Sequence, residues 1–276
     1  MGAGDASGPA AAEPARERDA AVAIARETGA LLRAHFARGV ATEWKDGHDP
    51  VSAADRDAED LIRARLAARF PGDVVVGEEG EEVAEASVRG RRRWYVDPLD
   101  GTTNFLKGRD RWAVSIAFCD AHDRVAAAAI HLPRTGALCE AVLGGGATQD
   151  GTPLRCGTTT ALPDALVALG ALTRGRPDQE VAAALAGQVL SLRVTGSGAA
   201  DLVDVAAGRA DAFLSTGSGR WDLAAGALLA AEAGATVTTA RGAAATGPTE
   251  TIVAAAPGLH PALLAVLAER DGASRG

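Results

Sequence analysis

The chain has 276 residues, of which 47% are hydrophobic and 23% are charged, so it can bury a substantial core as one large domain or two modest ones. Its 28 Lys and Arg against 36 Asp and Glu give a net charge of −8, which excludes a protein that binds nucleic acid through a broad basic surface. The three cysteines lack CxxC spacing and no apolar run approaches the length of a bilayer span, so we expect a soluble cytoplasmic protein with no disulfide framework, zinc site or membrane anchor.

The first elements expected along the chain are a tail and two helices. Residues 1–15 are rich in Gly, Ala and Pro and are expected to form a disordered tail. Apolar residues then recur at steps of three and four, which predicts an amphipathic helix from residue 16 to about Gly39. A second helix is expected over residues 53–70, where Ser52 and Asp55 resemble a capping box.

The next part of the chain has the periodicity of strands. Residues 73–77 and 93–96 are short β-rich runs, each followed by carboxylates. Further runs are separated by turn residues and predict an antiparallel meander, with strands at residues 112–119, 124–131 and 137–142.

From residue 155 the pattern changes to an alternation of strands and helices. Strands are expected at residues 166–169, 210–214, 235–238 and 251–255. Helices are expected at residues 178–190, 197–207, 222–233 and 260–269. A meander flanked by helices and followed by this alternation predicts two layered subdomains, residues 16–154 and 155–276, with a cleft between them.

Three acidic clusters lie at the ends of predicted strands or the starts of predicted helices. They are GEEG at residues 77–80, DPLDGTTNF at residues 97–105 and RWD at residues 220–222. Converging carboxylates without matching Lys or Arg cannot all stay ionised unless a cation neutralises them. Oxygen ligands without Cys or His select Mg²⁺ or Mn²⁺, so the clusters predict a site for a hard divalent cation.

The DPLDGTTNF segment is the most specific of the three clusters. Pro98 stiffens the chain between two carboxylates, and Gly101 permits a close backbone approach. Thr102 and Thr103 can begin a helix whose free N–H groups hold a phosphate. Taken alone, the GEEG motif is also typical of a solvated acidic turn, and the RWD motif is also typical of a helix N-cap.

The order and spacing of these motifs resemble the inositol monophosphatase family of Mg²⁺-dependent, Li⁺-sensitive phosphatases. GEE comes first, DPLDGTTNF second and WD-x-A-A-G well downstream. Lys45 with DPVSAAD at residues 49–55, and TGSGAADLVDVAAGRADAF at residues 195–213, also resemble stretches of that family. The resemblance covers nearly the whole chain and implies an α+β and α/β fold, an αβαβα layered sandwich, which usually forms a homodimer.

The resemblance also implies a set of metal ligands for two to three Mg²⁺ ions, with Mn²⁺ as a possible substitute. One ion would be held by Glu78, Asp97 and the Leu99 carbonyl. A second would be held by Asp97, Asp100 and Asp222, with Asp97 bridging the two. Glu78 would also serve a third, weaker site.

The catalytic and phosphate-binding groups follow from the same resemblance. Thr102, oriented by Asp55, would act with Glu78 to take the proton from a metal-bound water that attacks phosphorus in line. The backbone N–H groups of Gly101 and Thr102, at the start of a helix that continues through Thr103, would bind phosphate oxygens.

The resemblance implies that the substrate is a small phosphate monoester, and the identity of this ester is less well defined by the sequence. Family members that act on inositol phosphates carry a Glu seven residues before the WD aspartate, where this chain has Ser215. Ser197 and Gly198 would offer groups near the substrate, and Arg220 would either face a second anionic group or lie solvated on a loop.

We therefore expect an inositol-1-monophosphatase with relaxed specificity, and three alternatives to this function remain. DPLDGTTNFLKG followed by WAVSIAF is closer to inositol phosphatases than to histidinol phosphatases, which are the second candidate. A 3′-phosphonucleotide or sugar bisphosphatase is the third. A catalytically silent metal-binding scaffold is the alternative that is not an enzyme, and it is disfavoured because every expected metal carboxylate is present.

Overall fold

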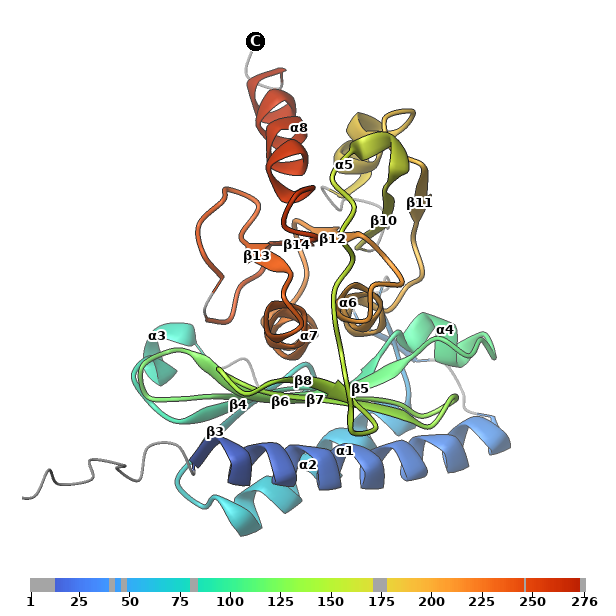
Figure 1. Cartoon of the computed structure of the whole chain (residues 1–276). Coiled ribbons are helices and arrows are strands. Elements are labelled where there is room, and N and C mark those ends of the chain that lie inside the picture. Colours follow the sequence, from blue (N-terminus) through green and yellow to red (C-terminus); the bar gives the residue numbers. More distant parts are fainter. Residues whose placement is uncertain are drawn as a thin grey trace, which may run out of the picture.

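The structure, a computed structural model shown in Figure 1, describes residues 13–39, 43–45, 49–79, 84–170, 178–245 and 247–273. Its elements stack as helices, sheet, helices, sheet and helices, so the expected αβαβα sandwich is confirmed. The seven-stranded sheet is formed by residues 74–153 and the five-stranded sheet by residues 166–255. The predicted subdomain boundary after residue 154 lies in the connection between the two sheets.

The first helical layer consists of α1 (Glu13–Arg38) and α2 (Ala53–Arg69), which cover one face of the seven-stranded sheet (Figure 1). Helix α1 begins earlier than expected, so residues 13–15 belong to it and not to a tail. Pro14 is compatible with this start because proline is tolerated in the first turn of a helix. Residues 1–12 lie outside the described part of the chain. Between the helices, β1 (Glu43–Lys45) pairs with β2 (Asp49–Val51).

The larger sheet has the strand order β3-β4-β5-β6-β7-β8-β9, and only the β3–β4 pair is parallel. The predicted meander is therefore confirmed. Two short strands at its edge, β8 and β9, were not predicted. The strands are β3 (Val74–Gly77), β4 (Arg93–Asp100), β5 (Ala113–Cys119), β6 (Val125–Leu132), β7 (Ala137–Val142), β8 (Gly146–Gln149) and β9 (Thr152–Pro153), with short helices α3 (Glu85–Val88) and α4 (Thr102–Leu106) near β4.

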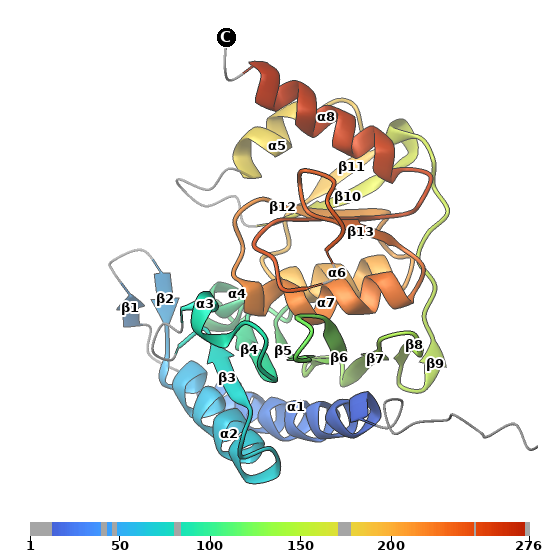
Figure 2. The same cartoon turned by 90° about the vertical axis from the view of Figure 1, so that its left-hand side faces the viewer.

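The middle layer consists of α6 (Gly198–Ala206) and α7 (Arg220–Glu232), which lie between the two sheets (Figure 2). Both helices are rich in alanine, and their buried residues pack on the strands on either side. A Cβ on Gly226 of α7 would lie 2.4 Å from a methyl carbon of Leu202 of α6. The close packing of the two helices therefore requires glycine at this position.

The smaller sheet has the order β11-β10-β12-β14-β13 and is covered on its outer face by α5 and α8. The helix expected at residues 178–190 ends at Leu185, and Gly187 follows with a φ of 79°, a conformation that ends helices. The elements are the 3₁₀ turn η2 (Leu162–Asp164), β10 (Leu166–Leu169), α5 (Asp178–Leu185), β11 (Ser191–Arg193), β12 (Ala212–Ser215), β13 (Thr236–Thr238), β14 (Ile252–Ala255) and α8 (His260–Ala273).

Cys119, Cys139 and Cys156 are free thiols, and burial raises the pKa of Cys139 to about 12. Within the described ranges, no helix is both long enough and apolar enough to cross a bilayer.

Candidate active site

Three carboxylates from separate parts of the chain converge where α7 packs on the seven-stranded sheet. Glu78, Asp97 and Asp222 each offer one oxygen, and these oxygens lie within 4.8 Å of one another. Asp97 is buried, while the other two side chains are half-buried. The structure thus brings together one residue from each of the three acidic motifs.

Sheet register explains why Glu78 and Asp97 are neighbours. Strands β3 and β4 are parallel, with Gly77 opposite Val96. The residues that follow this pair, Glu78 and Asp97, are therefore carboxylates on neighbouring chain segments at the same end of the β3–β4 pair.

Asp222 is brought to the cluster by the first turn of α7. The helix begins at Arg220, two residues earlier than expected, so Asp222 is the third residue of the helix and not its first. The Gly219 N–H donates to Asp222 Oδ2 at 2.9 Å, which is half of a capping arrangement and helps to fix the side chain.

Strand β4 extends through the motif that was expected to follow it. It continues to Asp100, and its pairing with β5 shifts register between Asp97 and Asp100. Pro98 has no N–H for the ladder, which is consistent with a bulge at this point. The Leu99 N–H donates to Asp97 Oδ1 at 3.0 Å, so the bulge also orients the central carboxylate.

Asp100 is held by the N-terminus of α6 and is not one of the three converging residues. Ser197 Oγ and the Ala199 N–H donate to its Oδ2 at 2.6 and 2.7 Å, and the Gly198 N–H donates to its Oδ1 at 3.3 Å. Ser197 and Gly198 were expected to offer groups near the substrate. In the structure the Ser197 hydroxyl and the Gly198 N–H donate to Asp100, a predicted metal ligand.

The electrostatics of the cluster favour a bound cation. Burial raises the pKa of Asp97 well above its usual range, and the charges of Glu78, Asp100 and Asp222 raise it further. Burial also raises the pKa of Asp100, although the donors from α6 oppose this effect. A divalent cation would replace the repulsion among these groups with attraction, and an all-oxygen donor set fits Mg²⁺ or Mn²⁺.

Thr102 and Asp55 form a second polar pair beside the metal-ligand candidates. Thr102 Oγ lies 3.0 Å from Asp55 Oδ1 and 3.0 Å from the Leu99 carbonyl oxygen, and its single proton can be donated to one of them at a time. Ser52 donates to Asp55 Oδ2 through its N–H at 2.8 Å and its hydroxyl at 2.6 Å, which confirms the predicted capping box. Burial raises the pKa of Asp55, opposed by these hydrogen bonds.

The backbone around Gly101 can accommodate only glycine. Its φ is 95°, and a Cβ would lie 3.0 and 3.1 Å from two backbone carbonyl oxygens. Helix α4 begins at the next residue, as predicted, and Thr103 is exposed. Asn104 Nδ2 donates to the carbonyl oxygens of Arg111 and Thr195 at 2.7 and 2.8 Å, which ties α4 to the loop before α6.

The two residues expected to select the substrate have partners within the protein. Ser215, the last residue of β12, is fully buried, and its hydroxyl hydrogen-bonds Asp178 Oδ2 at 3.2 Å and Ser218 Oγ at 2.7 Å. Arg220 forms an ion pair with Glu250 at 2.9 Å. The structure therefore places Ser215 away from solvent and directs the Arg220 charge toward another side chain.

Two buried carboxylates near the site were missed by the sequence analysis. Glu59 and Asp178 are 3% and 1% exposed and accept hydrogen bonds from backbone N–H groups of Glu79 and Thr216, respectively. Glu59 follows Asp55 by one helical turn, so an acidic pair on the buried face of a helix was the available signal. Asp178 has no comparable pattern in the sequence.

Comparison with known proteins identifies the family. Residues 14–271 match the inositol monophosphatase family. The chain is 42% identical to an inositol-1-monophosphatase of Rhizobium meliloti over 70% of this chain and 73% of that protein. It is 39% identical to inositol-1-monophosphatase SuhB of Mycobacterium tuberculosis over 94% of this chain and 96% of that protein.

A solved structure agrees with this assignment. The extragenic suppressor protein suhB of Bartonella henselae superposes with a TM-score of 0.82 and 31% identity, over 90% of this chain and 97% of that one. The family match, the relatives and the shared fold together show that the chain belongs to the inositol monophosphatase family, a family of phosphoric monoester hydrolases.

Proposed function

We propose that the protein hydrolyses small phosphate monoesters in a Mg²⁺-dependent reaction and that inositol-1-phosphate is its preferred substrate. The observation that carries the proposal is the convergence of Glu78, Asp97 and Asp222 within 4.8 Å, with the Thr102–Asp55 pair beside them. The choice of inositol-1-phosphate is supported by the names of relatives, which are inositol-1-monophosphatases at 39–42% identity.

The metal ligands proposed are those implied by the family resemblance. Glu78, Asp97 and the Leu99 carbonyl would hold one ion, and Asp97, Asp100 and Asp222 the other, with Mn²⁺ able to substitute. When bound, Mg²⁺ supplies positive charge that acidifies water and neutralises the transferring phosphoryl group. Asp97 suits a central position because the charges of all the other carboxylates in this set act on it.

Thr102 and Asp55 would control the proton of the attacking water. When the Thr102 hydroxyl donates its proton to Asp55 Oδ1, a lone pair of Thr102 Oγ remains free to accept a hydrogen bond from water. Glu78, half-buried at the same edge, would act with Thr102 in receiving the proton. This arrangement orients a water for in-line attack without a covalent phosphoenzyme.

The start of α4 would hold the phosphate. The first N–H groups of a helix have no acceptor within the helix, and in α4 these belong to the turn around Gly101, Thr102 and Thr103. Gly101 allows this turn to approach the backbone carbonyls of Gly196 and Arg111 closely, which places it against the loop before α6.

Substrate selection would depend on groups other than the Ser215 hydroxyl. Ser215 is fully buried against Asp178, so a glutamate introduced there would face a second carboxylate in a buried position. Specificity for one ester is accordingly expected to be relaxed. Histidinol phosphate and a 3′-phosphonucleotide or sugar bisphosphate remain the alternative substrates, and a homodimer in the cytoplasm remains part of the proposal.

Phosphate release with Mg²⁺ tests the proposal across five esters: inositol-1-phosphate, histidinol phosphate, fructose-1,6-bisphosphate, 3′-phosphoadenosine-5′-phosphate and glycerol-2-phosphate. We expect the fastest release from inositol-1-phosphate, inhibition by Li⁺ and no release after chelation of Mg²⁺. Faster release from another ester would support the proposed metal-dependent hydrolysis and contradict the choice of inositol-1-phosphate as the preferred substrate. Mg²⁺ binding without release from any ester would favour the metal-binding scaffold and contradict the proposal.

A further inference from the structure

The turn that carries Glu78 rests on a buried carboxylate from α2. Glu59 is 3% exposed, and its Oε2 accepts a hydrogen bond from the Glu79 N–H at 2.7 Å. This N–H belongs to the residue directly after Glu78. Glu59 is therefore tied to the backbone of a predicted metal ligand, one helical turn after Asp55, which contacts Thr102.

The other oxygen of Glu59 is paired with an arginine. Arg63 Nε donates to Glu59 Oε1 at 2.7 Å, and Arg63 Nη1 donates to the Val75 carbonyl oxygen at 3.0 Å. The arginine compensates the charge of Glu59, so this carboxylate can lie near the acidic cluster without adding its full repulsion. Arg63 also joins α2 to strand β3, so the Glu59 side chain is held both by its own helix and by the strand that precedes Glu78.

Gly77 shows how closely the carboxylate and the turn are packed. A Cβ on Gly77 would lie 2.5 Å from Glu59 Oε1 and 2.7 Å from Glu59 Oε2. These separations are far below van der Waals contact, so any larger residue at position 77 would displace the Glu59 side chain or the turn. The glycine that begins the GEE motif is thus explained by the position of Glu59.

We propose that Glu59 is a positioning residue that holds Glu78 toward Asp97 and Asp222. The carboxylates of Glu78, Asp97 and Asp222 lie within 4.8 Å of one another and repel, so an ion-free cluster needs a restraint that keeps Glu78 in place. The hydrogen bond from Glu79 to Glu59 provides one such restraint through the backbone. This inference rests on the proposed metal-dependent function.

The test compares Glu59→Gln and Gly77→Ala with a matched control, Asp73→Asn. Asp73 lies just before β3, at the opposite end of the strand from Glu78, and its side chain is 8% exposed. It is also paired with an arginine, through two hydrogen bonds from Arg92 at 2.9 and 3.2 Å. The control therefore removes a buried, arginine-paired carboxylate next to the start of the same strand without touching the turn at Glu78.

The measurements are Mg²⁺ affinity by calorimetry without substrate, the Mg²⁺ concentration for half-maximal phosphate release, the KM of the ester and the unfolding temperature. Glu59→Gln replaces one acceptor oxygen by a donor, and Gly77→Ala displaces the carboxylate. Both should weaken Mg²⁺ binding by about tenfold, the lower end of the range for residues that orient metal ligands. The KM of the ester at saturating Mg²⁺ should change much less.

Asp73→Asn should lower the unfolding temperature and leave Mg²⁺ affinity unchanged. Wild-type affinity in both Glu59→Gln and Gly77→Ala would overturn the proposal. Equal weakening in Asp73→Asn would also overturn it, because the effect would then be general destabilisation. If the wild-type protein itself bound no Mg²⁺, the proposed function would fail first, and this inference with it.

Discussion

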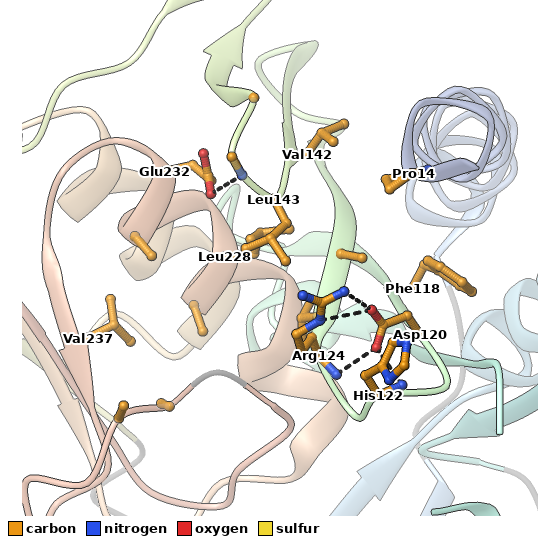
Figure 3. A pocket seen from close by; sticks show the side chains of 18 of the residues that line it. Pro14, Phe118, Asp120, His122, Arg124, Val142, Leu143, Leu228, Glu232 and Val237 are labelled. Carbon is orange, nitrogen blue, oxygen red and sulfur yellow. Dashed lines mark hydrogen bonds and ion pairs between the residues drawn. The ribbon is translucent and has the colours of Figure 1, made fainter. Parts of the chain in front are cut away.

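Two regions of the molecule contain carboxylates contributed by α7 and by the seven-stranded sheet or its turns, and they differ in how those charges are balanced. At the candidate active site, Glu78, Asp97 and Asp222 converge, and burial together with the neighbouring negative charges raises the pKa of Asp97. The second region is a cavity of about 1070 Å³ near the far end of α7, shown in Figure 3. None of the three converging carboxylates lines this cavity.

In the cavity, each carboxylate drawn in Figure 3 accepts hydrogen bonds from an arginine or from backbone N–H groups. Arg124 donates to Asp120 Oδ2 at 2.8 and 3.0 Å, and Glu232 accepts from the N–H groups of Gly144 and Gly146 at 2.7 and 2.8 Å. Much of the remaining lining is apolar, including Leu143, which is 42% exposed. The Asp120 and Glu232 carboxylates therefore stabilise turns of the protein, and their charges are balanced by these donors.

The comparison shows that charge imbalance marks the candidate site better than cavity size does. Asp222 and Glu232 lie on the same helix, about 15 Å apart at the helical rise of about 1.5 Å per residue. At the start of α7, Asp222 belongs to a group of carboxylates that repel one another. At its end, Glu232 accepts hydrogen bonds from the turn between β7 and β8. Variants at the two ends should therefore separate chemistry from stability.

The largest effect is expected for Asp97→Asn. The amide removes the central charge of the cluster, so turnover should fall by about a thousandfold or more, since a metal contributes several kcal/mol of charge stabilisation. The metal-free variant should unfold at a higher temperature than the metal-free wild type, because repulsion is relieved. Phosphate release and thermal unfolding with a chelator measure the two effects. A variant that keeps wild-type turnover would contradict the account.

Asp222→Asn should lower turnover by about a hundredfold through weaker metal binding. Its fold should survive, because an asparagine oxygen can still accept the hydrogen bond from Gly219 at the start of α7. Circular dichroism and thermal unfolding should therefore resemble those of the wild type within about 0.5 kcal/mol of unfolding free energy. Near wild-type turnover would remove Asp222 from the metal site.

The metal-free protein should lose stability as pH rises. The folded-state pKa values of Asp97, Asp100 and Asp201 are raised, that of Asp201 to about 6, and a raised folded-state pKa stabilises the fold at low pH and loses this contribution as pH rises through it. Mg²⁺ binds the ionised carboxylates, so it should raise the unfolding temperature more at about pH 7.5 than at about pH 5. An equal effect of Mg²⁺ at both pH values would contradict this prediction.

The smallest effect is expected at the other end of α7. Glu232→Gln should weaken the hydrogen bonding of the turn between β7 and β8 and cost about 1 kcal/mol of unfolding free energy. Turnover and Mg²⁺ affinity should stay at wild-type values, because the side chain lies about 15 Å from the carboxylate cluster along the helix. Reduced Mg²⁺ affinity in this variant would show that the two regions are coupled.

Much of the fold was predictable because it depends on local periodicity. The meander, the alternation after residue 155 and the Ser52–Asp55 capping box all follow from spacing along the chain. The short strands β8, β9 and β11, which lie at or beside the sheet edges, were missed because their sequences, GATQ, TP and SLR, contain no run of β-branched or aromatic residues. Propensity alone could not show that β4 continues through Pro98, since tertiary pairing with β5 decides it.

The candidate site was predictable in its residues and less so in its contacts. Carboxylates in three motifs predicted a common centre, and the parallel register of β3 and β4 places two of them side by side. The hydrogen bonds of Asp100 to α6, of Ser215 to Asp178 and of Glu59 to Glu79 join segments at least 20 residues apart in the sequence. No spacing rule connects such segments, so their partners required the structure.

A calorimetric titration of Mg²⁺ into the metal-free wild-type protein and into Asp97→Asn at neutral pH tests the central claim most directly. The account predicts saturable binding to the wild type and a loss of most of that binding in the variant. Phosphate release from inositol-1-phosphate should rise with the same Mg²⁺ dependence. Equal binding by both proteins, or phosphate release that persists in a chelator, would contradict the claim that these carboxylates form a catalytic metal site.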